Sequence, residues 1–326
     1  MKASLTILLL LAALLTACSQ PQELRRDARF FGTRATVVLD PDSTSAQTAM
    51  HEVMAELTTL DGILPPATAK PMLRTNVMLD SGDWFSVNPS IYPLVVRAKS
   101  YYRRSHGLFN PALLGTLKQL HGHYDKTGLE RPVNAKTLAT LVKHPPTMDE
   151  IQVNGIRMRN PNPKLRLDFG LLIYGYAVDA EIAHLRLLHI HNARISIGPV
   201  TRVIGLRNGK AWRVHGTHGH PGVALRDGEA ACLVDAGDAS LQPDLLDPRT
   251  GAAPSQPVTV LVIAGNASDA SVGCSVLALA GPRSWKRAAK DLGLDAVSLR
   301  TPDGHLLESP AMAARRKQGH ADGKNG

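Results

Sequence analysis

Residues 165–206 read LRLDFGLLIYGYAVDAEIAHLRLLHIHNARISIGPVTRVIGL. The spacing of apolar residues predicts a short strand at 165–167 and a long helix at 171–188. Two β-branched strands follow at 193–197 and 202–206, where a Gly-Pro pair between them predicts a tight hairpin. A long helix that leads directly into a hairpin is typical of an α+β fold.

The flanking segments fit the same fold class. Toward the N-terminus, the sequence predicts a strand at 33–39 and helices at 46–60 and 91–105. Toward the C-terminus, it predicts a strongly β-branched strand at 258–264 and a helix of small residues at 268–282. We therefore expect an α+β fold with mixed or antiparallel sheets and packed helices.

The N-terminal region has the features of a lipoprotein leader. Lys2 supplies a charge, and residues 5–15 form an apolar run that is too short for a membrane-spanning helix. Small residues directly precede Cys18, whose sulfur is the atom that a lipid would modify. We expect a lipoprotein signal peptide at residues 1–17, and a lipidated Cys18 with a polar spacer at residues 18–29. The alternative is an ordinary secretory leader followed by an incidental cysteine.

A lipid anchor would place the mature protein on a membrane of the cell envelope, facing the periplasm. Ser19 after the cysteine favours the outer membrane if the host has two membranes. The formal net charge of +9 suits acidic lipid or a phosphorylated ligand. Export and an aromatic content of 4% argue against nucleic acid as a partner. We expect one domain at residues 30–310 and a basic, disordered tail at residues 311–326.

Two sets of residues leave alternatives open. Cys232 and Cys274 either form a disulfide or act as small buried hydrophobic residues. His215, His218 and His220 lie in a Gly-rich stretch at spacings that permit a transition-metal site, or they belong to an exposed loop.

A series of short motifs follows the chain from residue 31 onward. They are Phe31-Gly32-Thr33, SHGLFNP at 105–111, LDFGLLIYGYAVD at 167–179, Ile197-Gly198, LDPRTG at 246–251 and Ser268-Asp269-Ala270. The most specific are GYAVD and, about 70 residues later, DPRTG. Together with the leader, these motifs resemble the FAD:protein FMN transferase family, the ApbE-type flavin-transferring lipoproteins.

The resemblance implies an ApbE-like two-lobed fold with a flavin cleft. It also implies a magnesium-assisted transfer of FMN from FAD to a Ser or Thr of an acceptor flavoprotein or redox complex, with release of AMP. The flavin candidates that it implies are Thr33, Phe109, Asp168 and Asp247. The magnesium candidates are the carboxylate of Asp269 and the backbone carbonyl of Leu171.

Several positions depart from the family pattern where its chemistry lies. Gly273 stands where the family has a Thr metal ligand, Tyr174 replaces a Lys, and Asp244 replaces a His. The hairpin Gly-Gly-Asp is residues 198–200 here, Gly-Pro-Val, and Asn110 replaces an Asp. We therefore expect magnesium-dependent transfer to be lost or much reduced, with the protein retained as a flavin-binding or scaffold protein. The alternative is an active transferase.

The retained candidates also have purely structural interpretations. Asp168 and Asp269 each lie near the start of a predicted helix, where a carboxylate can cap backbone N–H groups. Asp247 precedes a proline and favours a turn. Phe109 could belong to the core rather than stack on a flavin ring.

Overall fold

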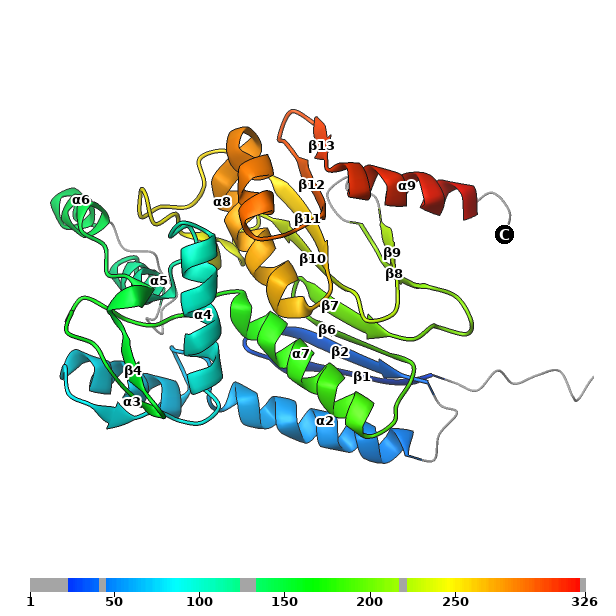
Figure 1. Ribbon diagram of the computed structural model, residues 1–326, viewed down its shortest axis with the longest axis horizontal. Helices are drawn as coiled ribbons and strands as arrows, with labels where there is room; N and C mark the ends of the chain where they lie inside the picture. The colour runs from blue at the N-terminus through cyan, green and yellow to red at the C-terminus, as the bar shows by residue number, and fades with distance from the viewer. Residues whose placement is uncertain (1–22, 41–44, 124–132, 217–221, 323–326) are drawn as a thin grey trace, which may run out of the picture.

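The computed structural model describes residues 23–40, 45–123, 133–216 and 222–322. Its centre is an eight-stranded sheet in the order β1-β2-β6-β7-β10-β11-β12-β13 (Figure 1), in which all neighbours pair antiparallel. The predicted α+β class is confirmed. The strands are β1 (Leu24–Phe30), β2 (Thr33–Leu39), β6 (Ala193–Ile197), β7 (Val200–Ile204), β10 (Ala230–Asp235), β11 (Thr259–Ala264), β12 (Ala296–Arg300) and β13 (Leu306–Glu308).

One face of the sheet is covered by α2 (Ala46–Asp61), α7 (Leu172–Leu187) and α8 (Ala267–Asp291), as Figure 1 shows. Helices α7 and α8 approach closely at Gly175, because a Cβ there would lie 2.4 Å from Oγ of Ser271. Asp179, about one turn further along α7, accepts hydrogen bonds from the backbone N–H groups of Ala267 and Ser268. The GYAVD motif therefore fixes how these two helices pack.

The opposite face is covered by α9 (Pro310–Asp322) and by the hairpin of β8 (Trp212–Val214) and β9 (Val223–Leu225). Side chains of strand β11 contribute to the cores on both faces of the sheet. Val260 and Val262 belong to the core beneath the three helices, whereas Leu261 and Ile263 belong to a second core that includes Met312 of α9. This alternation follows from the pleat of a strand, which directs successive side chains to opposite faces.

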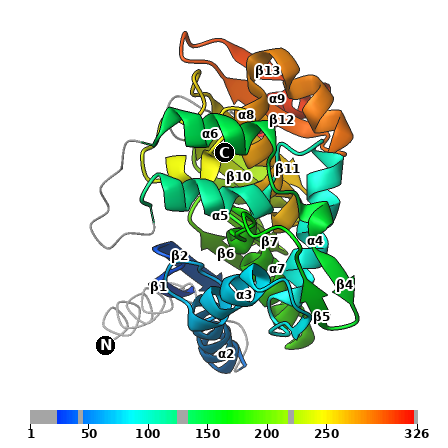
Figure 2. The ribbon, with the colours of Figure 1, turned by 90° about the vertical axis from the view of Figure 1, so that its left-hand side faces the viewer.

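A second lobe lies at one end of the sheet and faces the viewer in Figure 2. The large sheet and this lobe together give the two-lobed architecture that the resemblance implies. The lobe contains α3 (Lys70–Asp80), α4 (Tyr92–Arg104), α5 (Pro111–Leu120), α6 (Ala135–Lys143) and a small antiparallel sheet of β3 (Phe85–Ser86), β5 (Arg157–Arg159) and β4 (Gln152–Asn154). Two short 3₁₀ helices complete the chain, η1 (Met148–Glu150) and η2 (Gln242–Leu245).

The prediction of a disordered tail at residues 311–326 is wrong for the described part, because residues 310–322 form α9. Met312 is 3% exposed in the second core, and Arg315 forms an ion pair with Glu229. An apolar anchor and an ion pair thus hold a segment whose composition alone indicates disorder. In the same way, the second half of the predicted spacer at 18–29 belongs to strand β1, which pairs with β2 along its whole length.

Three local predictions also differ from the structure. Residues 165–167 form no strand. The hairpin is tighter than predicted, because Ile197 pairs with Val200 and leaves only two residues in the turn. Helix α8 is interrupted at Gly281, which has a φ of 65°, and then resumes to residue 291 rather than ending there.

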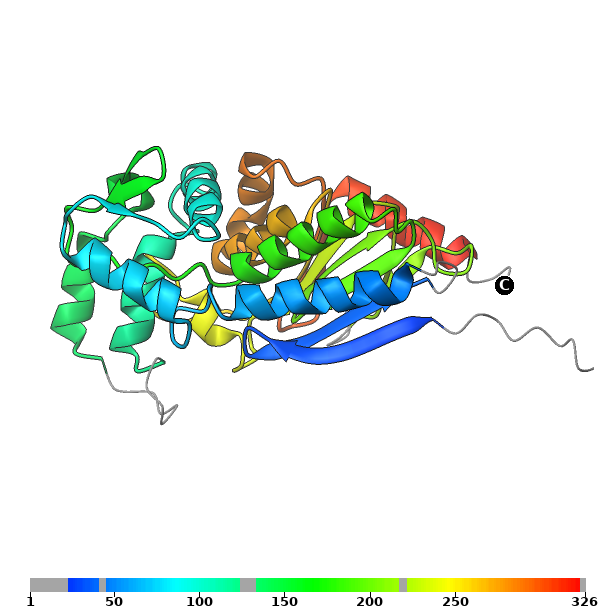
Figure 3. The ribbon, with the colours of Figure 1, turned by 90° about the horizontal axis from the view of Figure 1, so that it is seen from below.

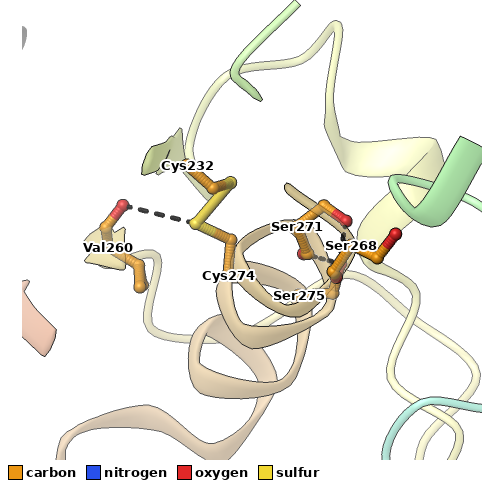
Figure 4. The surroundings of a disulfide bond; sticks show 6 residues. All are labelled: Cys232, Val260, Ser268, Ser271, Cys274 and Ser275. Carbon is orange, nitrogen blue, oxygen red and sulfur yellow. Dashed lines mark hydrogen bonds between the residues drawn. A yellow bond between two sulfur atoms is a disulfide. The ribbon is translucent and has the colours of Figure 1, made fainter. Parts of the chain in front are cut away.

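Cys232 of β10 and Cys274 of α8 form a disulfide (Figure 4), with Cα atoms 6.2 Å apart. Both residues are fully buried, and Cys274 lies beside Val260 of the neighbouring strand. Of the two alternatives that the sequence leaves open, the structure shows the disulfide, which ties α8 to the centre of the sheet.

The predicted signal peptide at 1–17 and the predicted lipidation site, Cys18, lie outside the described residues. Within the part of the chain that the structure describes, no helix combines the length and the apolar character needed to cross a membrane.

Candidate functional site

A buried group of charges lies where α5, the loop before α7 and η2 meet. Nζ of Lys118 lies 2.8 Å from Oδ2 of Asp168 and 2.5 Å from Oδ1 of Asp244. The side chains of Lys118 and Asp168 are 9% and 2% exposed. Burial alone would lower the pKa of Lys118, but the charges of the two carboxylates raise it above its usual value. The lysine is therefore charged and shared between both acids, in what we name the Lys118 network.

Tyr174 completes this network from the first turn of α7. Its hydroxyl lies near enough to Asp244 for that carboxylate to affect its pKa, and its ring lies 6.2 Å, centroid to centroid, from that of Phe31. Burial, and then the charges of Asp244 and Asp168, raise the pKa of Tyr174, so the phenol stays neutral. Two carboxylates, one ammonium and one phenol leave a net charge of minus one, in a place where the family pattern has a lysine and a histidine.

Phe109 lies close to the network but belongs to the core. It is 5% exposed and packs edge-on against Tyr101, with ring centroids 6.1 Å apart. The adjoining cavity, which Phe109 lines together with Asp244 and Ser275, measures only about 20 Å³. Sites for flavin-sized ligands occupy roughly 300–1,000 Å³. In this conformation, therefore, a flavin ring has no room beside Phe109.

A larger cavity of about 500 Å³ adjoins the small one, and both are lined by Leu108, Asn110 and Pro248. Asn110 donates from Nδ2 to the carbonyl of Pro146, while its Oδ1 is buried without a hydrogen-bond partner among the described residues. The cationic residues of this larger cavity are Arg104, Arg249 and Arg287, and its lining also includes His106 and the acid Asp291. The cavity thus offers positive charge, and one of its lining residues carries a buried, unsatisfied acceptor.

Asp247 shapes a turn and positions a neighbouring arginine. Its carboxylate accepts from the backbone N–H of Arg249 and pairs with the guanidinium at 2.6 Å. Arg249 in turn donates to the carbonyl of Leu279, which precedes the break in α8 at Gly281. The DPRTG motif therefore provides a hydrogen bond to the C-terminal end of the first segment of α8. The role of Asp247 as a flavin ligand stays a prediction.

Asp269 lies at the start of α8, at the contact with α4. Its two oxygens accept hydrogen bonds from the hydroxyl of Tyr101 at 2.8 Å and from Nδ2 of Asn266 at 2.7 Å. The guanidinium of Arg104 lies 3.8 Å away, and the Asp269 side chain is 29% exposed. A carboxylate with these three neighbours already has a cation and two donors.

The other two positions of the expected magnesium site, Leu171 and Gly273, offer no free oxygen ligand among the described residues. The carbonyl of Leu171 accepts backbone N–H groups of Tyr174 and Gly175, and Leu171 is fully buried. Gly273 carries no side-chain oxygen, and a Cβ there would lie 2.7 Å from Leu294 and 3.2 Å from Val262. This position therefore faces the apolar core, and the donor set does not fit an ion that prefers about six oxygens.

Thr33, the remaining flavin candidate, lies at the start of β2 beside the β6–β7 turn. A Cβ on Gly198 would lie 3.3 Å from its Oγ1. Thr33 thus lies near the sheet end where Phe31 contacts Tyr174. Its role in flavin binding stays a prediction.

Lys118 is the residue of this site that the motifs do not reveal. It lies outside all of them, and nothing in the family pattern points to it. A signal is nevertheless present, because Lys118 is the only charged residue in α5, whose sequence is PALLGTLKQL. A lone lysine in a helix that is otherwise almost entirely buried predicts an internal acidic partner.

Comparison with known proteins gives consistent results. The model of the ApbE family matches residues 31–298. A FAD:protein FMN transferase from Rhodobacter capsulatus is 30% identical over 255 residues, which are 74% of this chain and 48% of that protein. The chain therefore spans about half the length of this curated relative.

Two solved structures share the fold. The apo form of the flavinyl transferase ApbE from Pseudomonas stutzeri has a TM-score of 0.79 at 21% identity, with 92% of this chain and 99% of that chain covered. The flavin transferase ApbE from Vibrio cholerae has a TM-score of 0.76 at 19% identity, with 90% and 99% covered. The family match spans both lobes and all the motifs up to β12, and the chain belongs to the ApbE family.

Proposed function

We propose that this chain is a lipid-anchored ApbE relative that binds a flavin nucleotide but transfers FMN from FAD slowly or not at all. The observation that carries this proposal is the pairing of Lys118 with Asp168 and Asp244. The family pattern has a lysine at position 174 and a histidine at position 244, both suited to phosphate oxygens. In this chain the cation beside positions 174 and 244 is Lys118, and it is already paired with the carboxylates of Asp168 and Asp244.

The charge of the Lys118 network opposes phosphoryl transfer. Such reactions depend on positioning and on neutralising charge at the transferred group. A buried network with a net charge of minus one repels a pyrophosphate. Loss of a single stabilising donor typically costs about 10²–10³ in rate, and Tyr174 and Asp244 are two such losses.

The residues of the magnesium site support the same proposal. Asp269 is engaged by Tyr101, Asn266 and Arg104, and Gly273 faces the core. This donor set therefore supports no catalytic step through magnesium.

Binding of a flavin nucleotide is supported by the 500 Å³ cavity. Its arginines suit phosphate groups. Asn110 also lines this cavity, but its Oδ1 is buried, so a ligand would contact that acceptor only after the side chain turns toward the cavity.

An active transferase is the second candidate, and two observations favour it. The Rhodobacter capsulatus relative bears the description of an FAD:protein FMN transferase. Asp269 also remains at the position of the family's acidic ligand and is not fully buried. In this case the acceptor would be an exported or membrane redox protein.

The decisive assay incubates the full chain with FAD, magnesium chloride and an acceptor protein, and follows the acceptor by intact-mass analysis. We expect no mass gain, while quenching of flavin fluorescence reports binding that Arg249→Ala weakens. Addition of the mass of an FMN residue, at a rate abolished by Asp269→Ala, would establish the transferase instead.

We also propose that the chain is anchored in the envelope through Cys18, facing the periplasm. The support is the leader sequence, with small residues directly before the cysteine. Labelling with a radioactive fatty acid should mark the wild type and not Cys18→Ser. Equal membrane partitioning of both proteins, without label, would overturn the anchor.

A further inference from the structure

A second group of acids lies between α2 and α7, which run side by side on the sheet (Figure 3). Glu52 and Glu56 are one turn apart on α2, and Glu181 and His184 are one turn apart on α7. Glu181 is about two turns further along α7 than Tyr174. This group, which we name the Glu181 cluster, is therefore separate from the Lys118 network and does not depend on the proposed function.

The imidazole of His184 lies between the two acids of α2. Nδ1 lies 2.8 Å from Oε2 of Glu56, and Nε2 lies 3.0 Å from Oε2 of Glu52. One ligand atom each from Glu56, Glu181 and His184 lies within 4.8 Å of the others. Nε2 contacts Glu52, which is not one of these three residues. We therefore take Nδ1, the nitrogen next to Glu56, as the ligand atom of His184.

Glu181 distinguishes this cluster from the acidic groups that are common on protein surfaces. Its side chain is fully buried, at 0% exposed. Neither carboxylate oxygen has a hydrogen-bond partner among the described residues. A buried carboxylate without a partner is costly, and it is normally retained only with a proton, a counter-charge or a metal ion.

We propose that Glu56, Glu181 and His184 bind a divalent transition-metal ion of the zinc class. Two carboxylates and one imidazole are a three-ligand set that zinc accepts, with water in a fourth position. Ligand atoms around tetrahedral zinc are about 3.3 Å apart, so small rotamer changes from the present geometry suffice. Glu52 accepts the Nε2–H of His184 and thereby orients the ring, as carboxylates beside metal-binding histidines do.

The donor types exclude the commoner oxygen-binding cations as the preferred ligand. Magnesium and calcium favour sites made of oxygen atoms, whereas an imidazole with two carboxylates suits zinc and its neighbours. The spacing Glu-x-x-His on one helix, with a Glu from a facing helix, is also a ligand arrangement used inside helix bundles. Zinc binding would displace the proton from Nδ1 and any proton on Glu181.

Zinc chloride alone is the probe, titrated into the full chain in competition with a chromophoric chelator. The starting protein carries His215→Gln, His218→Gln and His220→Gln, so that the Gly-rich histidine stretch does not contribute. We expect one zinc per chain with micromolar or tighter affinity, and much weaker binding of magnesium chloride. Glu181→Gln and His184→Gln should each weaken zinc binding at least about 100-fold.

The matched control is His51→Gln, which removes an exposed imidazole from α2 next to Glu52. It should change zinc affinity by less than about threefold. Glu56→Gln, at a half-exposed position, should weaken binding at least about tenfold and decides the question if Glu181→Gln does not fold. The proposal is overturned if the starting protein binds no zinc at millimolar concentration, or if Glu56→Gln and His184→Gln bind it as tightly as His51→Gln does.

Discussion

Asp168 and Glu181 are both buried acids beside or within α7, yet only one of them is neutralised by its own chain. Asp168 is 1% exposed and accepts from Lys118 and from the backbone N–H of Gly170, each at 2.8 Å. Glu181 is equally buried and has no such partner among the described residues. Asp168 is thus a stable internal ion pair, whereas Glu181 requires a proton or a cation from solution.

This difference bears on how the chain departs from its family. At the family's chemical positions, Tyr174 and Asp244 replace cationic or titratable groups, and Lys118 supplies the charge from another helix. The positive charge that these substitutions remove is therefore replaced by Lys118 of the same chain. The result is a network whose carboxylates already pair with a cation of the protein. At the Glu181 cluster no described residue forms a hydrogen bond with the buried acid, and that is why we infer a ligand there.

The largest effect on the free energy of unfolding is expected when the Lys118 network is broken. Lys118→Met removes the ammonium and leaves Asp168 and Asp244 buried without their counter-charge. We expect the free energy of unfolding at pH 7 to fall by about 3–5 kcal/mol. Urea unfolding followed by circular dichroism measures this change.

Lys143→Met is the control for this variant, because Lys143 is exposed on α6. It should change the free energy of unfolding by no more than about 0.5 kcal/mol. Adding Asp244→Asn to Lys118→Met should recover part of the loss, since one of the unpaired charges is then gone. A loss below about 1 kcal/mol for Lys118→Met would mean that the network is not the internal ion pair described here.

The next effect concerns the pH dependence of Glu181. Burial, and then the charge of Glu56, raise the pKa of Glu181 to about 9 in the folded, metal-free protein, from a usual value of 4.5. Between these pH values the folded state binds more protons than the unfolded state, so stability falls as pH rises. Glu181→Gln mimics the protonated acid and should match the wild type at pH 4, but exceed it by roughly 3 kcal/mol at pH 7.

Unfolding in the presence of a chelator at several pH values tests this expectation. Asp295→Asn, at an exposed position, is the control and should show no comparable trend. A difference between Glu181→Gln and the wild type that does not vary with pH would show that Glu181 already has a counter-charge. The contrast with Asp168 would then disappear.

A smaller effect is expected at Gly273, where the family pattern has a threonine. A Cβ at this position would lie 2.7 Å from Cδ1 of Leu294 and 3.2 Å from a methyl of Val262. Gly273→Thr should therefore lower the free energy of unfolding by about 1 kcal/mol, since crowding exceeds the gain in helix propensity. Magnesium affinity should not rise. Calorimetry that shows tighter magnesium binding to Gly273→Thr would reopen the family's metal site.

The sequence predicts the framework of this fold better than its charged interior. The β-branched run at 258–264 predicts a strand, and the GYAVD motif predicts the helix that carries Asp179, because both signals are local. The pairing of Lys118 with Asp168 and Asp244 joins three segments that are far apart in the sequence. Only the folded chain shows which acid pairs with which cation, or that no described residue donates a hydrogen bond to the carboxylate of Glu181.

The end of α9 and the disulfide illustrate the same limit. Composition indicates disorder at residues 311–322, but Met312 packs in the second core and Arg315 pairs with Glu229 beside β10, contacts that no local pattern reveals. Cys232 and Cys274 are 42 residues apart, and their pairing depends on how α8 lies against β10. In each case a tertiary contact overrides the local signal.

The smallest expected effect sharpens the comparison at His184. Hydrogen bonds to Glu56, and to a lesser extent to Glu52, raise the pKa of His184 above its usual value, against a lowering by burial. The raised pKa of His184 stabilises the folded protein fully at pH values below the pKa of an unfolded histidine. This stabilisation is lost as the pH rises through the pKa of His184 in the folded protein. Both acids are about 40% exposed, so solvent screening keeps each contribution below about 1 kcal/mol.

Glu56→Gln should therefore lower the pKa of His184 more than Glu52→Gln does, because the contact at Nδ1 is the stronger of the two. NMR titration of the imidazole protons in metal-free protein measures both shifts, and His51 serves as an internal reference on the same helix. Equal pKa values in all three proteins would mean that His184 is not held between the two acids in solution. The Nδ1 side of the ring would then not be preorganised for a metal, and the Glu181 cluster would lose the feature that most separates it from the closed Lys118 network.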